Sequence, residues 1–400
     1  MITQKFLGST LLIAGTTIGA GMLALPLASA GIGFSASLLI MLTLWGLMAF
    51  TALLMVELHQ YAESHATLHT LAKQILGDKG KWIATAAMLF LFYSLCAAYI
   101  AGGGMQFTQR IGHLTGVQLS GVSGTLIFTL IVAGVVAIGT GTVDRVNRIL
   151  FCGKIIAMVM VLFFLAPNVT ESYLLNMPLQ QGLIVAAIPV IFTSFGFHGS
   201  IPAVVNYLDG DTPALRKVIL FGSAIPLVIY IFWQLVTLGV VSQSELVQNS
   251  GLGSLITLLT LKAHHSNLGS VIGVFADLAL LTSFLGVSLG LFEFLGDGLC
   301  RKGGKRNRSF VALLTFLPPL IFALVYPQGF IMALGYAAIA LAILAIFLPL
   351  MMVIRVRQQV PDGYYQVRGG IPALYLCGIA GVMIVGVQLL IVVGILPALG

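Results

Sequence analysis

Charged residues are scarce in this chain. Asp, Glu, Lys and Arg make up 8% of its 400 residues, while hydrophobic residues make up 59%. Soluble domains carry about 25% charged and about 45 to 50% apolar residues. The composition therefore excludes an ordinary soluble protein and indicates a polytopic membrane protein. We expect residues 1–400 to form a single transmembrane unit rather than several soluble domains.

Cysteine is rare as well, and the sequence signatures of zinc metalloproteases and of ion channels are missing. The four cysteines lie in or beside apolar segments without metal-ligand spacing, which predicts small buried hydrophobes and no metal site: Cys96, Cys152, Cys300 and Cys377. An HExxH motif and paired acids at membrane depth are absent, which argues against a membrane-embedded enzyme. A repeated filter sequence is also absent, which argues against a channel. We expect a protein that is not an enzyme and needs no cofactor.

Long apolar stretches are abundant. A membrane-spanning helix needs about 20 apolar residues. Eleven stretches qualify, at residues 6–30, 34–58, 82–107, 122–141, 149–166, 182–207, 218–241, 268–299, 310–326, 330–354 and 371–396. The sequence thus predicts an all-α fold with eleven transmembrane helices in a lipid bilayer.

The basic residues indicate how these helices are oriented. When the sides of the membrane alternate along the chain, all but two of the 19 Lys and Arg residues fall on one side. That side includes Lys5, Lys73, Lys79, Lys81, Arg301, Lys302, Lys305 and Arg306. The other side has only Arg110 and Lys262. The positive-inside rule then predicts a cytoplasmic N-terminus and a periplasmic C-terminus. It also explains the net charge of +7 without a nucleic-acid partner.

The first apolar stretch resembles a signal peptide with a cleavage-like site at residues 28–30. We expect no cleavage, because the charge pattern requires this stretch to span the membrane.

Two of the apolar stretches contain an interruption. Residues 15–22 read GTTIGAGM, here called the first break, and residues 193–202 read TSFGFHGSIP, here called the second break. Lipid cannot satisfy irregular backbone, so such segments survive only where protein buries them or where they line a cavity. Paired interruptions at matching places in two halves are the best sequence indicator of a transporter's central site.

The breaks divide the chain into two similar halves. Residues 6–166 hold five predicted spans and residues 182–354 hold five more, with a break in the first span of each half. Because five is odd, the second half begins on the opposite side of the membrane, which predicts a 5+5 inverted repeat. The eleventh span, residues 371–396, lies outside the repeat and is expected to be peripheral.

The breaks suggest a zwitterionic ligand. The helix that resumes near Met22 would offer free N–H groups to a carboxylate, with Thr16 and Thr17 as additional donors. Gly19, Ala20 and Gly21 would allow close backbone approach. The carbonyls from Ser194 to Gly196 in the second break would suit an ammonium group. The alternative is that the glycines only permit close helix packing.

Several segments resemble a known family. These are LGSTLLIAGTTIGAGMLALPLASAG (residues 7–31), IPVIFTSFGFHGSIP (188–202), FADLALLTSFLGVSLGLFEFLGD (275–297) and ALGYAAIALAIL (333–344). They are similar to the bacterial hydroxy/aromatic amino acid permeases. The resemblance implies a leucine-transporter-like fold with broken helices 1 and 6 and an extra eleventh helix. It also implies import of an aromatic amino acid, tyrosine foremost, across the inner membrane by proton symport.

Aromatic side chains could hold the ring of such a substrate. Phe195 and Phe197 flank the second break, and Tyr93 and Tyr99 belong to the third span, which the resemblance places beside the site. Each could equally pack against lipid or the core.

Three ionisable residues are candidates for proton coupling. Asp277 lies deep in the eighth span, and His198 lies in the second break and could bind substrate or relay a proton. Lys154 in the fifth span occupies, by resemblance, the place where sodium-driven relatives bind their ion. The alternatives are a structural hydrogen bond for Asp277 or His198 and snorkelling for Lys154.

Other functions stay open at this point. The resemblance makes Thr282 and Ser283 similar to the hydroxyl pair of the sodium-driven relatives, so sodium coupling is an alternative to protons. A permease for tryptophan or another neutral amino acid is the nearest rival, and a membrane channel or membrane-embedded enzyme is the alternative from another class. The expected partners are an aromatic amino acid, protons and lipid, and nothing requires an oligomer.

Overall fold

A computed structural model describes residues 2–62, 66–178, 182–249, 251–262, 266–299, 307–359 and 365–398. Cys300 and the basic residues Arg301, Lys302, Lys305 and Arg306 lie outside the described residues. All regular elements in the described ranges are helices, in agreement with the all-α prediction.

The helices follow one another through the whole chain. In order they are α1 (Ile2–Thr17), α2 (Gly21–Ser29), α3 (Gly33–His59), α4 (Leu68–Thr115), α5 (Gly121–Ile138), α6 (Thr140–Leu165), α7 (Glu171–Leu175), α8 (Leu183–Ser194), α9 (Ile201–Tyr207), α10 (Thr212–Val240), α11 (Gln243–Gln248), α12 (Leu252–Lys262), α13 (Ser266–Leu299), α14 (Arg308–Val325), α15 (Phe330–Ala342), α16 (Leu348–Gln359) and α17 (Gly370–Val392). A π-helical turn, Ile343–Phe347, joins α15 to α16. In the described residues, ten helical segments are long and apolar enough to cross a membrane, or eleven when α1 and α2 count as one bent span.

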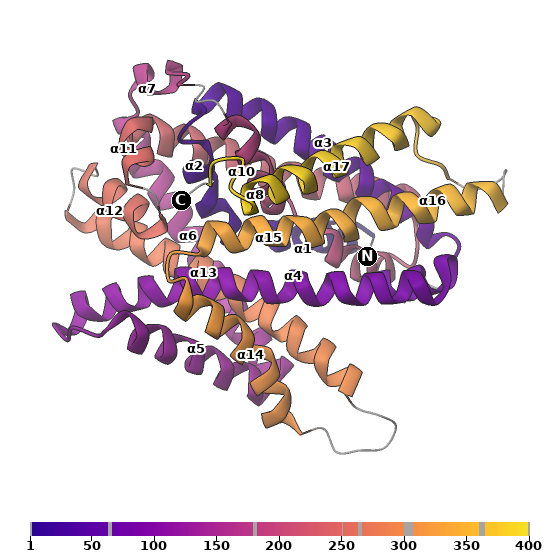
Figure 1. The fold of residues 1–400 in the computed structure, drawn as a ribbon, viewed down its shortest axis with the longest axis horizontal. Helices are drawn as coiled ribbons and strands as arrows, with labels where there is room; N and C mark the ends of the chain where they lie inside the picture. Colours follow the sequence, from indigo (N-terminus) through magenta and orange to yellow (C-terminus); the bar gives the residue numbers. More distant parts are fainter. Residues whose placement is uncertain are drawn as a thin grey trace.

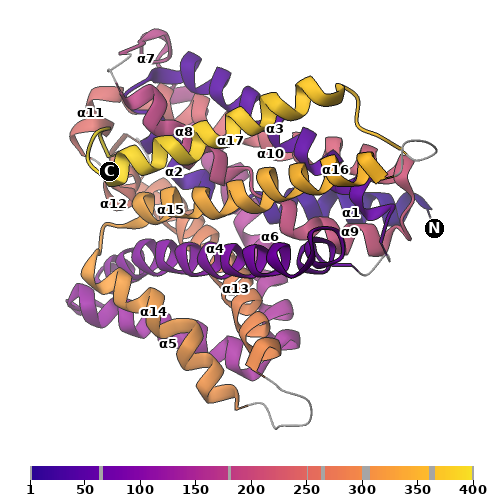
Figure 2. The same ribbon diagram turned by 45° about the vertical axis from the view of Figure 1, so that its right-hand side comes forward.

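The long helices run side by side. Helices α4, α15 and α16 lie along the long axis, while α14 crosses it obliquely beside α5 (Figure 1). Helix α13 packs against both α6 and α4, and α1 packs against α10. The N-terminus is marked towards the right and the C-terminus towards the left in both ribbon views (Figures 1 and 2). Helix α17, the predicted eleventh span, packs against α15 and α8.

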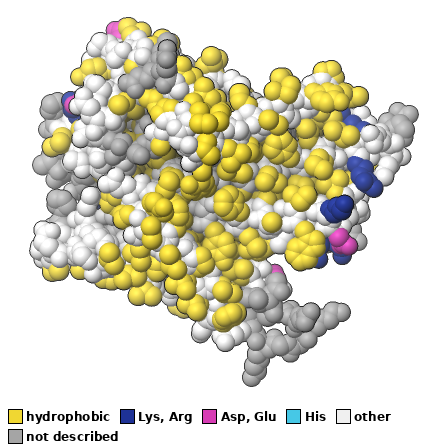
Figure 3. Space-filling model, viewed as in Figure 1, with side chains coloured by type: hydrophobic (Ala, Val, Ile, Leu, Met, Phe, Trp, Pro, Cys, Tyr) yellow, Lys and Arg dark blue, Asp and Glu magenta, His cyan; other side chains and the backbone are white. Residues whose placement is uncertain are grey.

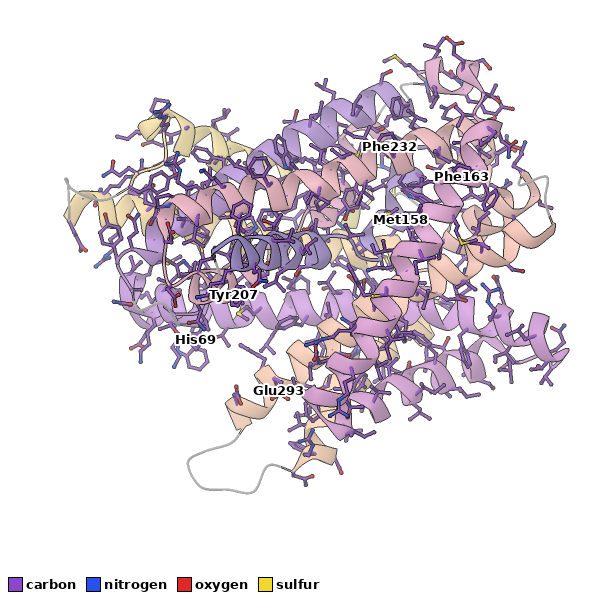
Figure 4. The ribbon with its side chains drawn as sticks, turned by 180° about the vertical axis from the view of Figure 1, so that it is seen from behind. His69, Met158, Phe163, Tyr207, Phe232 and Glu293 are labelled. Atoms are coloured by element: carbon purple, nitrogen blue, oxygen red, sulfur yellow. The ribbon has the colours of Figure 1, made fainter. Side chains whose placement is uncertain are left out.

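The outer surface is apolar, as contact with lipid requires. Phe163 on α6 and Phe232 on α10, labelled in Figure 4, are 73% and 55% exposed. The space-filling view shows hydrophobic side chains over most of the visible face, with Lys and Arg gathered mainly at the end that holds the N-terminus (Figure 3). Exposing so large an apolar surface is unfavourable in water but not in the hydrocarbon interior of a membrane.

Helices α6 and α4 start much earlier than hydropathy predicted. Helix α6 begins at Thr140 instead of residue 149, and its first turns include the exposed Asp144 and Arg148, joined by a 2.8 Å ion pair. Helix α4 begins at Leu68 instead of residue 82 and bends at Gly77. Charged first turns lower the mean hydropathy without preventing helix formation. As a consequence, Lys154 lies well inside α6 rather than near its beginning.

A buried carboxylate ties three segments together at the end that holds the N-terminus. Glu57 on α3, whose side chain is 1% exposed, accepts hydrogen bonds from Arg357 Nε and Nη2, both at 2.7 Å, and from the Val367 N–H at 2.8 Å. Gln60 and the Tyr365 backbone exchange two further hydrogen bonds, at 2.9 and 3.0 Å. These contacts fix the segment before α17 against α3 and α16.

We predict that Arg357→Ala destabilises the fold. Removing one partner of a buried ion pair leaves the other charge uncompensated, which costs about 3 kcal/mol or more. The midpoint of thermal unfolding in detergent should fall clearly below that of the wild type. Arg355→Ala, at an exposed position on the same helix, is the control and should leave the midpoint unchanged. Equal midpoints for the two variants would show that the pair contributes nothing.

Candidate functional site

The first break separates two helices in the middle of the protein. Helix α1 ends at Thr17, helix α2 begins at Gly21, and the two are bent by 52°. The Ala20 N–H donates to Ser283 Oγ on α13 at 2.9 Å, and the Met22 N–H donates to the Gly19 carbonyl at 3.2 Å. Among the described residues, none accepts a hydrogen bond from the Gly21 N–H.

The second break lies directly against the first. Helix α8 ends at Ser194, residues 195–197 are not helical, and a short 3-10 turn, His198–Ser200, leads into α9. Ser194 Oγ donates to the Gly21 carbonyl at 3.1 Å. A Cβ on Gly21 would lie 3.2 Å from Ser194 Cα, which is tighter than ordinary contact. Glycine at position 21 is therefore what allows the two breaks to touch.

A buried tyrosine that the sequence analysis missed bridges the two breaks. The hydroxyl of Tyr230 on α10 lies 2.6 Å from the Thr17 carbonyl and 3.0 Å from the Ser194 carbonyl. These are the last carbonyls of α1 and α8, which have no partner within their own helices. One turn further, Gln234 Nε2 donates to Ser29 Oγ at 2.6 Å. The sequence did contain a signal for this role. Tyr230, Gln234 and Thr237 are polar residues spaced along one face of an otherwise apolar span, and such residues usually face the protein interior.

A cavity of about 630 Å³ opens where the breaks meet. Eleven of the residues singled out from the sequence line it: Thr16, Thr17, Gly19, Gly21, Tyr99, Lys154, Ser194, Gly196, His198, Thr282 and Ser283. They come from α1, α4, α6, α8 and α13 as well as from both breaks. The fold therefore gathers residues from widely separated parts of the chain around one space.

Other residues singled out from the sequence do not line this cavity. Ala20 and Met22 are not in its wall. Phe195 packs against the ring of Tyr230 at a centroid distance of 5.3 Å, and Phe197 packs beside His198 at 5.1 Å. Both phenylalanine rings therefore support the wall from behind.

Tyr93 and Asp277 lie elsewhere. Tyr93 donates to the Leu314 carbonyl at 2.9 Å and lines a separate apolar cavity of about 300 Å³ between α4, α14 and α15. Asp277 forms a 2.8 Å ion pair with Arg110, which joins α13 to α4. This contact matches the structural alternative for Asp277.

Lys154 reaches the first break from α6. Its Nζ donates to the Ile18 carbonyl at 2.8 Å and to Thr282 Oγ1 at 3.3 Å, and lies 4.5 Å from the centre of the Phe151 ring. The residue is 2% exposed, and its ammonium forms no ion pair with a carboxylate in the described part of the chain. The charge is held by neutral oxygens and an aromatic face, and it does not snorkel to the surface.

The hydroxyls around the first break are largely committed to their own helices. Thr16 donates to the Leu12 carbonyl at 2.7 Å, and Thr17 donates to the Ile13 carbonyl at 2.8 Å. The expectation that these two threonines offer hydrogens to a ligand is therefore not met in this arrangement, and only their lone pairs are free. The reason is geometric: a threonine in a helix reaches the carbonyl four residues earlier.

His198 points into the protein instead of towards freed backbone carbonyls. Its Nε2 lies 2.9 Å from Thr51 Oγ1 on α3, and its Nδ1 is buried with no partner among the described residues. The side chain is 4% exposed and belongs to the cavity wall.

One short pattern in α13 resembles the nucleophile motif of serine hydrolases. Residues 286–290 read GVSLG, which fits GxSxG. The motif acts at a sharp turn between a strand and a helix. Here Ser288 is fully buried in the middle of a helix, and its hydroxyl donates to the Phe284 carbonyl. The serine is not placed to act as a nucleophile.

Comparison with known proteins identifies close relatives. The model of the tryptophan/tyrosine permease family matches residues 2–388. The tyrosine-specific transport systems 1 and 2 of Haemophilus influenzae are 45% and 43% identical to the chain, covering 98% and 99% of it and 99% of their own lengths. The tryptophan-specific transport protein of the same organism is 35% identical, over 92% of this chain and 93% of its own length.

We predict that Tyr230→Phe lowers stability although only one oxygen is lost. Two buried carbonyls would be left without a donor, and an unsatisfied buried polar group costs about 1 to 3 kcal/mol. The thermal midpoint in detergent should fall, whereas Tyr326→Phe, the same change at a position 51% exposed, should not alter it. An unchanged midpoint for Tyr230→Phe would mean that the carbonyls find other partners.

Proposed function

The chain belongs to the tryptophan/tyrosine permease family, and we propose that it imports an aromatic amino acid, tyrosine foremost, across the bacterial inner membrane together with protons. The observation that carries this proposal is the cavity at the meeting point of two helix breaks, lined by backbone groups of opposite polarity. The ten apolar helices and the family membership agree with a multi-pass membrane protein.

The breaks offer both ends of an amino acid a partner. Gly21 stands at the beginning of α2, where the helix dipole and the unpaired N–H favour a carboxylate. The carbonyls of Thr17 and Ser194 share the single hydrogen of Tyr230, so the pair can accept from an ammonium as well. The ring would then lie towards Tyr99 and the apolar wall formed by α4 and α15. A volume of about 630 Å³ is ample for tyrosine.

The helix packing supports the 5+5 inverted repeat of the leucine-transporter type. In that scheme α1 corresponds to α8, α3 to α10, α4 to α13, and α6 to α15 with α16. Helix α1 packs against α10, and its counterpart α8 packs against α3. Likewise α13 packs against α6, and its counterpart α4 packs against α15. Swapping each helix for its counterpart therefore preserves these contacts, as a two-fold repeat requires.

Charge distribution supports a cytoplasmic N-terminus. Arg110 and Lys262, which the topology leaves on the periplasmic side, are each paired with an acid, Asp277 at 2.8 Å and Glu245 at 2.9 Å. Hydrogen bonds from Ser242 and from Lys262 lower the pKa of Glu245, which keeps that pair charged near neutral pH. The periplasmic basic charges are thus neutralised. The N-terminus and the C-terminus are marked towards opposite sides of both ribbon views, which agrees with an odd number of spans (Figures 1 and 2).

The cavity extends towards the same end as the N-terminus. Its wall includes Leu11 and Leu12, about one turn before the first break, and Ser200 near the end of the second break. None of the α2 residues beyond Gly21 takes part. We assign this arrangement to the inward-facing state of the transport cycle.

Lys154 is the residue to which we assign proton coupling. Its ammonium holds the Ile18 carbonyl inside the first break, so gaining or losing the proton changes a contact of the break itself. The Thr282 and Ser283 hydroxyls, which could have served sodium, instead contact Lys154 and the Ala20 N–H. This arrangement supports protons as the coupling ion over the alternative, sodium.

Uptake into proteoliposomes tests the function. With an inward proton gradient, the purified protein should accumulate labelled tyrosine, and unlabelled tyrosine or tryptophan should compete better than leucine. Accumulation that needs sodium and ignores the proton gradient would refute the proton assignment. Preference for leucine would refute the aromatic assignment.

For Lys154→Ala we predict loss of accumulation with exchange retained. Exchange of labelled for unlabelled tyrosine needs only the binding site, whereas uphill uptake needs the proton that Lys154 carries. Lys217→Ala, at an exposed position on α10, is the matched control and should accumulate tyrosine normally. Wild-type accumulation by the Lys154 variant would remove this residue from coupling.

A further inference from the structure

His198 lines the cavity and has one ring nitrogen without a hydrogen-bond partner in the described part of the chain. The side chain lines the cavity wall and is 4% exposed, and its Nδ1 is buried without a partner in the described part of the chain. Buried polar atoms are nearly always hydrogen bonded, so an unpaired one in a binding cavity points to a partner that comes with the ligand.

The neighbouring threonine determines which kind of partner this is. Thr51 Oγ1 lies 3.2 Å from the Met48 carbonyl, to which it donates, and 2.9 Å from His198 Nε2. A hydroxyl has one hydrogen, and we assign it to the Met48 carbonyl, so that the threonine accepts from His198. Nε2 therefore carries the hydrogen of the neutral imidazole, and Nδ1 has a free lone pair. On this assignment, a side chain of the cavity wall carries a free hydrogen-bond acceptor.

We propose that His198 Nδ1 accepts a hydrogen bond from a donor on the substrate's ring and so selects tyrosine and tryptophan over phenylalanine. The phenol O–H of tyrosine and the indole N–H of tryptophan are such donors, and phenylalanine has none. The inference rests on the proposed function, because it requires an aromatic amino acid in this cavity. It adds the atom that distinguishes between rings of similar shape.

The physical basis of the selection is the cost of leaving Nδ1 unpaired. Phenylalanine would exclude water from the acceptor without replacing its hydrogen bond. One neutral hydrogen bond lost in this way corresponds to about a tenfold loss in affinity. The backbone contacts in the two breaks are common to all three amino acids and cannot supply this difference.

Asn147 is the other cavity-lining residue in the described ranges with a buried unpaired side-chain atom, Oδ1. It lies on α6, two turns before Lys154 and away from the second break. It could also act as an acceptor, so the test has to separate it from His198.

Competition against labelled tyrosine in proteoliposomes provides the test. The wild type should bind tyrosine about tenfold more tightly than phenylalanine. 4-Aminophenylalanine, which carries a donor, should behave like tyrosine, and 4-fluorophenylalanine, which carries none, should behave like phenylalanine. The opposite order of the two analogues would show that His198 donates instead of accepting, and would overturn the proposal.

Two substitutions of His198 separate its two nitrogens. His198→Gln places an amide near Nε2, within reach of Thr51, but leaves no acceptor near Nδ1, so the tyrosine-to-phenylalanine affinity ratio should fall towards one. His198→Asn places its amide near Nδ1 and should retain most of the ratio. An unchanged ratio in His198→Gln would overturn the proposal, as would loss of the ratio in Asn147→Ala instead.

A third variant tests the role of the threonine. Thr51→Val frees the imidazole to exchange its hydrogen between the two nitrogens, so the ratio should fall part of the way. Thr43→Val, the same change at an exposed position on the same helix, should leave the ratio as in the wild type. A wild-type protein that takes up no aromatic amino acid would refute the proposed function, whereas equal affinity for tyrosine and phenylalanine in the wild type would refute this inference alone.

Discussion

The need to satisfy backbone polar groups away from water governs this structure. Irregular chain at membrane depth loses the hydrogen bonds of a helix, and lipid offers none in return. Here each break supplies partners for the other, through Ser194 Oγ and the Gly21 carbonyl. Neighbouring helices supply the rest, Tyr230 from α10 and Ser283 from α13. The non-helical segments can exist only because they are packed together.

Polar groups on the cavity-lining residues describe the ligand that we propose. Gly21, Thr17, Ser194 and His198 line one cavity. They carry an unpaired N–H, two carbonyls that share the Tyr230 hydrogen, and an unpaired ring nitrogen. On our proposals they correspond to a carboxylate, an ammonium and a ring donor. A packing role for the glycines alone would not explain why these polar groups lie at one cavity. Gly21 does also permit the close approach to Ser194.

The sequence predicted the position of the breaks because glycine clusters interrupt otherwise apolar helices, and it predicted the spans because hydropathy dominates their energetics. It did not predict which way side chains point in non-helical chain. Phe195 and Phe197 lie behind the cavity wall because their non-helical backbone angles set the direction of their side chains. A periodic sequence pattern contains no information about such angles. The pairing of Asp277 with Arg110 was also hidden, because it joins helices far apart in the chain. Tyr230 was missed because a single tyrosine in an apolar span usually faces lipid or an interface.

Three residues of the first break are each held by a different helix. The Thr17 carbonyl is bound by Tyr230 of α10, the Ile18 carbonyl by Lys154 of α6, and nearby the Ala20 N–H by Ser283 of α13. A substrate group placed at the Thr17 carbonyl and a proton placed on Lys154 therefore act on adjacent peptide units. Coupling between two ligands is reciprocal. If substrate binding shifts the Ile18 carbonyl, it therefore changes the affinity of Lys154 for its proton, and protonation of Lys154 changes the affinity for substrate by the same factor. On our proposal, proton symport needs no long pathway through the protein, because both ligands bias the same few bonds of one helix break.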